Sequence, residues 1–143
     1  MAEGENVLTA VDKAIEKKCA YIFISASGGM RMMTNILSLM QMTRMTVGIN
    51  ELRKNNLPYI VIATSPTTGG LTASIASISD VCIGETGATW AFAGRRIVEN
   101  TEKSQLPENF QTVEWAKEKS GQIDMILDPV SYTHLTLPTI LLV

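Results

Sequence analysis

The sequence predicts an α/β protein built on a parallel sheet. Two continuous apolar runs of strand length, 20–25 and 57–64, are each followed by a glycine-containing loop and then by a helical pattern. This order occurs twice, which is typical of α/β proteins whose ligand sites lie at the carboxyl ends of parallel strands. A chain of 143 residues fits one domain with a core large enough to fold.

The first half of the chain predicts two helices and two strands. Residues 8–18 predict an amphipathic helix, because apolar residues recur at helical spacing opposite charged ones. The run 20–25 predicts a strand covered on both faces. Residues 32–55 are too densely apolar for a surface helix and predict a largely buried one, with its methionines filling the core. The run 57–64 predicts a second buried strand, with Pro58 at its start.

The second half of the chain predicts shorter elements. Residues 71–79 form a pattern of small residues that favours a helix approached closely by its neighbours. The other expected elements are two short strands at 80–84 and 88–93, helices at 95–103 and 112–120 around the loop 104–111, and a last strand at 122–128.

Composition restricts the classes of function. Acidic and basic residues nearly balance, 14 against 12, so no electrostatic footprint for nucleic acid is visible. We expect no membrane span, because the apolar runs are short. We also expect no secretory signal, because acidic residues occur near the start of the sequence. Cys19 and Cys82 each lie among apolar residues, which favours buried small side chains in a reducing compartment over a disulfide or a metal pair. We therefore expect a cytoplasmic protein.

Residues 129–143 form a tail of different character, without charge and with the only histidine, His134. One interpretation is an edge strand with alternating residues. We favour another: residues 129–139 match the translation of a transposase-type sequencing adaptor over eleven consecutive residues, so 129–143 is a non-native tail to be left out of fold reasoning. Without His134, residues 1–128 cannot assemble a Ser–His or Cys–His nucleophile pair.

Two glycine loops, 27–29 and 67–70, each lead from a strand into a helix. A helix start has free N–H donors and the positive end of the dipole, and glycine gives close access to the backbone. Such a loop can bind an anion, or polarise a carbonyl as it becomes an enolate or a tetrahedral oxyanion. The alternative is ordinary turn chemistry with close helix packing. Neither is a phosphate loop, since no Gly-Lys-Ser or Gly-Lys-Thr follows.

Six sequence blocks carry a family resemblance. They are SASGGMRM, ILSLMQM, LPYIVIATSPTTGGLTAS, FAGRRIVENT, KSQLPENFQ and GQIDMILD. In this order they resemble the biotin-dependent acetyl-CoA carboxylase carboxyltransferase β subunits of bacteria and plastids, from about Glu5 to Asp128. The ending AKEKSGQIDMILD is also similar to a segment shared by many crotonase-fold proteins. The resemblance implies a crotonase-like (ClpP/crotonase) spiral of ββα units, incomplete at both ends, over residues 1–128.

The implied activity is transfer of the carboxyl group from carboxybiotin to acetyl-CoA, giving malonyl-CoA for fatty acid synthesis. Two backbone N–H groups would stabilise the thioester enolate, and the biotin nitrogen left after CO₂ release would take the methyl proton, so no histidine is needed. The resemblance carries the donors over to four glycines: Gly28, Gly29, Gly69 and Gly70. It adds four substrate-binding candidates: Ser27, Arg31, Thr68 and Arg96.

The resemblance also implies partners for a subunit in the bacterial cytosol, in preference to the plastid stroma. These are the carboxyltransferase α subunit, in a heterotetramer of two α and two β chains, the biotin carboxyl carrier protein and biotin carboxylase. Zinc belongs only to the family's amino-terminal four-cysteine ribbon, which this sequence lacks, so we expect no metal here. The fragment alone is expected to be inactive or weak and poorly soluble, or to unfold without cooperativity.

Three places depart from the family pattern. The family has a glutamine–glutamate–glycine run near residues 33–35, where this chain has Met-Thr-Asn. Met30 stands where the family has alanine, which narrows the expected pocket, and Arg95 replaces proline and puts a positive charge at a helix start, against the dipole preference. With Arg31 and Arg96, Arg95 is also a candidate for CoA phosphates or for the partner subunit. Such changes leave open a carboxyltransferase or decarboxylase subunit for another short acyl-CoA, or a noncatalytic crotonase-like scaffold. A self-compartmentalising serine protease shares the general fold, but the lack of a native histidine argues against it.

Overall fold

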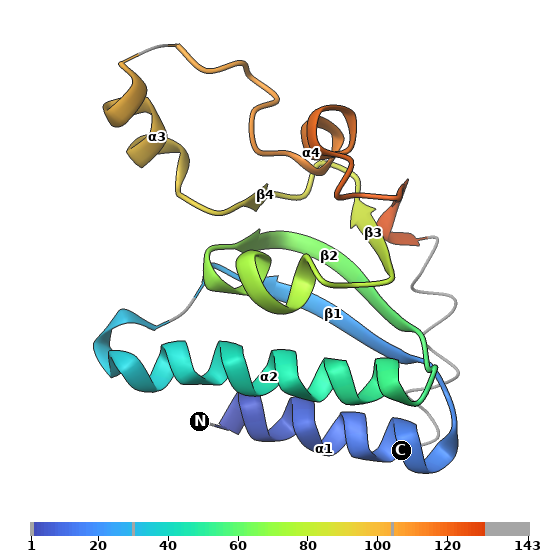
Figure 1. Cartoon of the computed structure of the whole chain (residues 1–143). Helices are drawn as coiled ribbons and strands as arrows, with labels where there is room; N and C mark the ends of the chain where they lie inside the picture. Colours follow the sequence, from blue (N-terminus) through green and yellow to red (C-terminus); the bar gives the residue numbers. More distant parts are fainter. Residues whose placement is uncertain (1, 30, 104, 131–143) are drawn as a thin grey trace.

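The computed structural model describes residues 2–29, 31–103 and 105–130, which contain a five-stranded sheet (Figure 1). Its strand order is β1 (Tyr21–Ser27), β2 (Tyr59–Thr68), β3 (Val81–Glu85) and β5 (Met125–Leu127), with every neighbouring pair parallel. The short β4 (Trp90–Ala91) pairs in parallel with the end of β2. The predicted parallel sheet is confirmed.

The two long helices, α1 (Ala2–Lys17) and α2 (Ile36–Lys54), lie side by side along one face of the sheet (Figure 1). They pack closely because α2 has Gly48 at the crossing, where a Cβ atom would lie 2.8 Å from a methyl group of Leu8. An ion pair of 2.6 Å between Arg44 and Glu5 also joins them. Between helices and sheet lies the core, whose main members are Val7, Val11, Ala14, Met45, Ile49, Leu52, Tyr59, Val61 and Ile75.

The remaining elements are short. A 3-10 turn, η1 (Met32–Thr34), precedes α2, and a π-helical turn, η2 (Thr72–Ala76), follows β2. Towards the carboxyl end come α3 (Arg95–Glu102) and α4 (Val113–Ser120), which flank the predicted loop. The helix expected over 71–79 is shorter than predicted, because helical residues run from 70 to 76 and a turn over 77–78 then leads to β3.

Two expectations about the burial of whole elements are wrong. Among the described residues, strand β1 is covered on one face only, because the helices lie on one side of the sheet, and Ile22 and Ile24 are 52% and 49% exposed. Helix α2 buries a single stripe, since it contacts α1 and η2 along one side. Its exposed apolar side chains include Ile36, Leu37, Leu39, Met40 and Val47, so the methionine-rich segment is not core throughout.

The two cysteines differ. Cys82 is buried in β3 as expected, but Cys19 is exposed just after α1. Burial raises the pKa of the Cys82 thiol to about 11, and the Asp124 carboxylate adds to the increase while a hydrogen bond with Ser79 opposes it. A thiol held protonated in this way is a poor nucleophile.

The structure describes the helices of this chain, but it does not describe most of the tail. None of the helices in the described part of the chain is long and apolar enough to span a bilayer. Met30 and residues 131–143, including His134, lie outside the described residues. The expectations for a narrowed pocket and for a non-native tail therefore stay predictions.

Candidate functional site

The two glycine loops meet at the carboxyl ends of β1 and β2. A Cβ atom on Gly69 would lie 3.1 Å from the Cα atom of Gly29, and one on Gly29 would lie 3.4 Å from the Cα atom of Gly69. Both residues have positive φ angles, +113° for Gly29 and +65° for Gly69. Backbone thus packs directly on backbone, in a conformation that glycine alone adopts easily.

Buried hydroxyl groups hold the two strand ends in register. The Oγ of Ser25 lies 2.7 Å from the Oγ1 of Thr67, which also contacts the carbonyl oxygen of Thr64 at 2.8 Å. In return, the Thr64 hydroxyl donates to the carbonyl oxygen of Ser25 at 2.7 Å. The pairing register shifts between Ser25 and Ser27, and this network joins the strands across the irregularity, next to the two glycine loops.

Replacing Thr67 with valine is expected to lower the free energy of unfolding by about 1–3 kcal/mol, because it leaves buried polar groups without their partner. Thr67 is fully buried. Urea unfolding of both proteins measures the difference. A matched control is Thr46→Val on the exposed side of α2, which should change stability by less than about 0.5 kcal/mol. Equal stabilities for the two variants would contradict the role of the network.

The glycines divide into two kinds by what their N–H groups do. The N–H of Gly29 donates to the Oγ of Ser27 at 3.2 Å, and the N–H of Gly69 donates to the carbonyl oxygen of Ala91 at 3.0 Å. Gly70 instead lies in the first turn of the short helix, where N–H groups have no partner within the helix. The described hydrogen bonds of the loops likewise do not use the N–H of Gly28.

Substrate-binding candidates lie at different distances from this pair of loops. Ser27 and Thr68 flank the glycines, and the Thr68 hydroxyl reaches the carbonyl oxygen of Ser27 at 3.5 Å. Arg31 is exposed and lines, with Ser27 and Gly29, a cleft of about 770 Å³. This volume is within the usual range for small-molecule sites of about 300–1,000 Å³. The rest of the lining is mixed. Its apolar side chains include Val7, Tyr21, Phe23, Ile24, Leu37 and Met45, and its polar ones are Glu3, Asn6, Thr34, Ser38 and Gln41.

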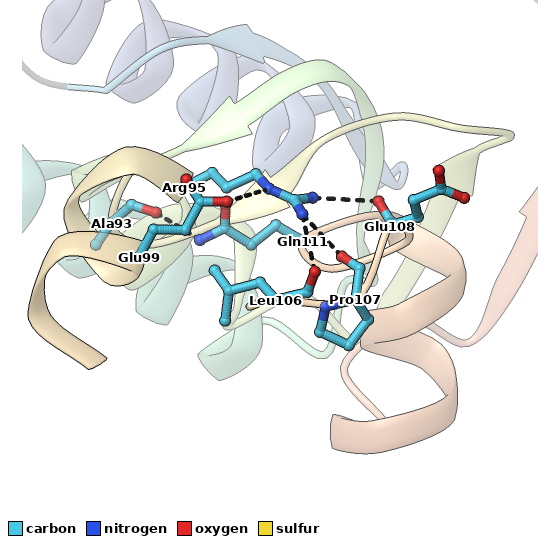
Figure 2. Close-up of polar contacts among 7 residues, drawn as sticks. All are labelled: Ala93, Arg95, Glu99, Leu106, Pro107, Glu108 and Gln111. Carbon is cyan, nitrogen blue, oxygen red and sulfur yellow. Dashed lines mark hydrogen bonds and ion pairs between the residues drawn. The ribbon is translucent and has the colours of Figure 1, made fainter. Parts of the chain in front are cut away.

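The two arginines at the start of α3 have different surroundings. Arg96 is exposed, and its guanidinium forms no ion pair or hydrogen bond with other side chains in the described part of the chain. The guanidinium of Arg95 is instead occupied by Glu99 and by carbonyl oxygens of the loop before α4 (Figure 2). Its role as a phosphate or partner contact stays a prediction.

One part of the site escaped the sequence reasoning. The segment around β4 runs beside the second glycine loop, where Ala91 accepts the Gly69 N–H and the carbonyl oxygen of Phe92 lies 3.9 Å from a Cβ built on Gly69. The sequence predicts a strand here, but it carries no signal for pairing with the end of β2.

Known proteins resemble this chain over most of its length. The carboxyl transferase domain family matches residues 1–128. Acetyl-coenzyme A carboxylase carboxyl transferase subunit beta from Pelagibacter ubique is 50% identical over 127 residues, which cover 89% of this chain and 41% of the relative. The protein of the same name from Hirschia baltica is 53% identical over 128 residues, 90% of this chain and 37% of the relative. The chain thus spans about two fifths of the length of these curated relatives.

Solved structures show the same fold. Transcarboxylase 12S superposes with a TM-score of 0.80 at 21% identity, covering 96% of this chain and 27% of that one. A Pseudomonas malonate decarboxylase heterodimer gives 0.69 at 19% identity, covering 89% and 57%. An enoyl-CoA hydratase from Mycobacterium smegmatis gives 0.58 at 11% identity, covering 96% and 63%. The crotonase-like α/β fold predicted from the sequence is confirmed.

Proposed function

Because this chain belongs to the carboxyl transferase domain family, we propose that it is part of the β subunit of an acetyl-CoA carboxylase carboxyltransferase. The proposed reaction transfers a carboxyl group from carboxybiotin, a substrate presented by a carrier protein, to the methyl carbon of acetyl-CoA. Identities near 50% to proteins of that name support the assignment. The product is malonyl-CoA.

The observation that carries the proposal is the close pairing of the two glycine loops. Deprotonation of the acetyl methyl group places negative charge on the thioester oxygen, which N–H donors stabilise more strongly as the charge grows. We assign the donors to Gly28 and Gly70, whose N–H groups are not used in the described loop contacts. Gly29 and Gly69 then act by letting the loops approach.

Proton transfer in this proposal needs no side chain of the site. Release of CO₂ from carboxybiotin leaves a basic ureido nitrogen, which accepts the methyl proton. The enolate carbon then forms the new bond to CO₂, and the thioester carbonyl returns. The role of the chain is to hold the thioester oxygen at the N–H donors, so that this exchange occurs at a fixed carbon.

We place the rest of acetyl-CoA around the loops. Ser27 and Thr68 border the oxygen site, the cleft beside the first glycine loop accepts the flexible thioester arm, and the charges of Arg31 and Arg96 are available for phosphates. We propose that the α subunit, the biotin carboxyl carrier protein and biotin carboxylase complete the enzyme. The named relatives are bacterial proteins, which favours the bacterial cytosol as its location.

A chimeric subunit tests this function. Residues 2–128 would replace the matching segment of the Pelagibacter ubique relative, and the chimera would be combined with the α subunit of that organism. We expect malonyl-CoA-dependent carboxylation of a biotin analogue, and saturable binding of acetyl-CoA by calorimetry. Binding without turnover would favour a noncatalytic scaffold. Turnover of a longer acyl-CoA in preference to malonyl-CoA would move the assignment to another carboxyltransferase, and loss of both binding and turnover would refute it.

A further inference from the structure

The guanidinium of Arg95 binds residues 106–108 of the loop that leads to α4, an arrangement that we call the guanidinium clasp (Figure 2). Its Nε donates to the carboxylate of Glu99 at 2.9 Å. Its Nη1 donates to the carbonyl oxygen of Glu108 at 3.2 Å, and its Nη2 donates to those of Leu106 at 3.2 Å and Pro107 at 3.0 Å. All three nitrogens of one guanidinium are therefore engaged, with three consecutive main-chain carbonyl groups on one side.

The clasped loop is linked to the second glycine loop. At its end lies Gln111, which is 9% exposed. Its side-chain amide donates to the carbonyl oxygen of Ala93 at 2.6 Å, and its main-chain carbonyl oxygen accepts the N–H of Trp90 at 2.9 Å. The neighbouring Ala91 accepts the N–H of Gly69. A chain of hydrogen bonds thus connects the loop to β4 and β4 to the glycine site.

Apolar packing supplies little to hold α3 and the clasped loop, whereas Trp90 and Ala91 of β4 are buried. Helix α3 has no buried residue, and Phe92 and Ile97 are 71% and 63% exposed. A ring contact occurs at the end of the loop nearest α4. There the rings of Phe110 and Trp115 pack edge to face, with their centroids 4.9 Å apart. Between α3 and that contact, the guanidinium clasp is the main attachment that the described residues provide.

We propose that Arg95 is a positioning residue for the glycine site: by clasping residues 106–108 it keeps Gln111 and β4 against the Gly69 loop. The inference rests on the proposed function for its catalytic consequence, but the clasp itself is a property of this chain. Arginine suits the role because its planar group offers five donors in a fixed fork. Lysine has a single nitrogen and cannot span three carbonyl groups and a carboxylate.

Hydrogen exchange of the 143-residue chain tests the clasp without any activity. In Arg95→Met and Arg95→Lys, the amides of Trp90 and Gly69 should exchange about tenfold faster or more. The acceptor of the Trp90 N–H, Gln111, follows the released segment, and the acceptor of the Gly69 N–H, Ala91, is the neighbour of Trp90 in β4. The amide of Val61, in the centre of β2, is the internal reference. Glu99→Gln is the matched control, because it removes the ion pair and leaves the three carbonyl contacts in place, and it should change these amides less than about twofold.

Two further measurements separate the outcomes. Ethylguanidine at millimolar concentration should restore slow exchange in Arg95→Ala and have no effect on the original protein. In the chimeric enzyme, Arg95→Lys should lower kcat by about 10- to 100-fold with the KM for acetyl-CoA changed less than about twofold, because misplaced donors act in the transition state.

Unchanged exchange in every Arg95 variant overturns the clasp. Faster exchange with unchanged kcat overturns the positioning role, whereas an inactive chimera with the original Arg95 counts against the proposed function alone.

Discussion

Gly70→Pro is expected to lower the rate of carboxyl transfer by about 10²- to 10³-fold, the effect of removing one oxyanion donor. Proline has no N–H, and Gly70 is the first residue of its short helix, a position at which proline is tolerated because the N–H has no helical partner. The first helical bond runs from the N–H of Ala73 to the carbonyl oxygen of Gly69, so the substitution removes no bond of the helix. It therefore removes the proposed donor without removing a helical hydrogen bond.

Gly70→Ala is the matched control, because alanine keeps the N–H and also suits a helix start. The chimeric enzyme provides the measurement, with kcat for malonyl-CoA-dependent carboxylation compared among the three proteins and far-ultraviolet circular dichroism confirming the fold. We expect Gly70→Ala to keep most of the activity. Equal activity of the proline and alanine variants would remove Gly70 from the donor assignment.

Gly69→Ala is expected to cost about 2–4 kcal/mol in the free energy of unfolding, the sum of a left-handed backbone penalty and a steric one. The residue has a φ angle of +65°, and its added Cβ would approach the backbone of Gly29 to 3.1 Å. Real Cβ atoms rarely come so near to backbone atoms, so the two loops must move apart. The same change should reduce carboxyl transfer, since the donors lie on these loops.

Gly87→Ala separates the two causes. Gly87 has a similar φ angle of +73°, but a Cβ atom there would meet nothing within 4 Å. It should cost only the backbone penalty of about 1–2 kcal/mol. Urea unfolding of the two variants gives the difference due to the contact with Gly29. If both variants lose the same stability, the close approach of the loops contributes nothing measurable.

Much of the fold follows from local patterns. The order of strand, glycine loop and helix occurs twice, and adjacent parallel strands end at one edge of a sheet, so the meeting of Gly29 and Gly69 was predictable in outline. The family blocks added the activity. What local patterns report is the chemistry of a segment and not its surroundings. Ile24 is as apolar as a core residue, yet it is half exposed because no layer of the described chain covers that face.

The finer features of the site depend on partners that are distant in sequence. Whether the N–H of Gly69 or that of Gly70 is available depends on Ala91, which lies beside Gly69 only because β4 pairs with β2. Arg95 likewise reads from sequence as a misplaced charge at a helix start. Its compensation comes from carbonyl groups of a loop about a dozen residues further on, which no pattern of side chains reveals.

Strand β1 has a consequence for the behaviour of this chain at high concentration. It contains no charged residue and has a single neighbour, β2, among the described strands. The outer edge of such a strand is a template on which another polypeptide can add a strand, and natural sheets commonly guard it with charge, proline or a covering segment. With Ile22 and Ile24 also exposed, β1 makes self-association through strand addition the expected route to insolubility, through an edge of the folded chain rather than through an unfolded state.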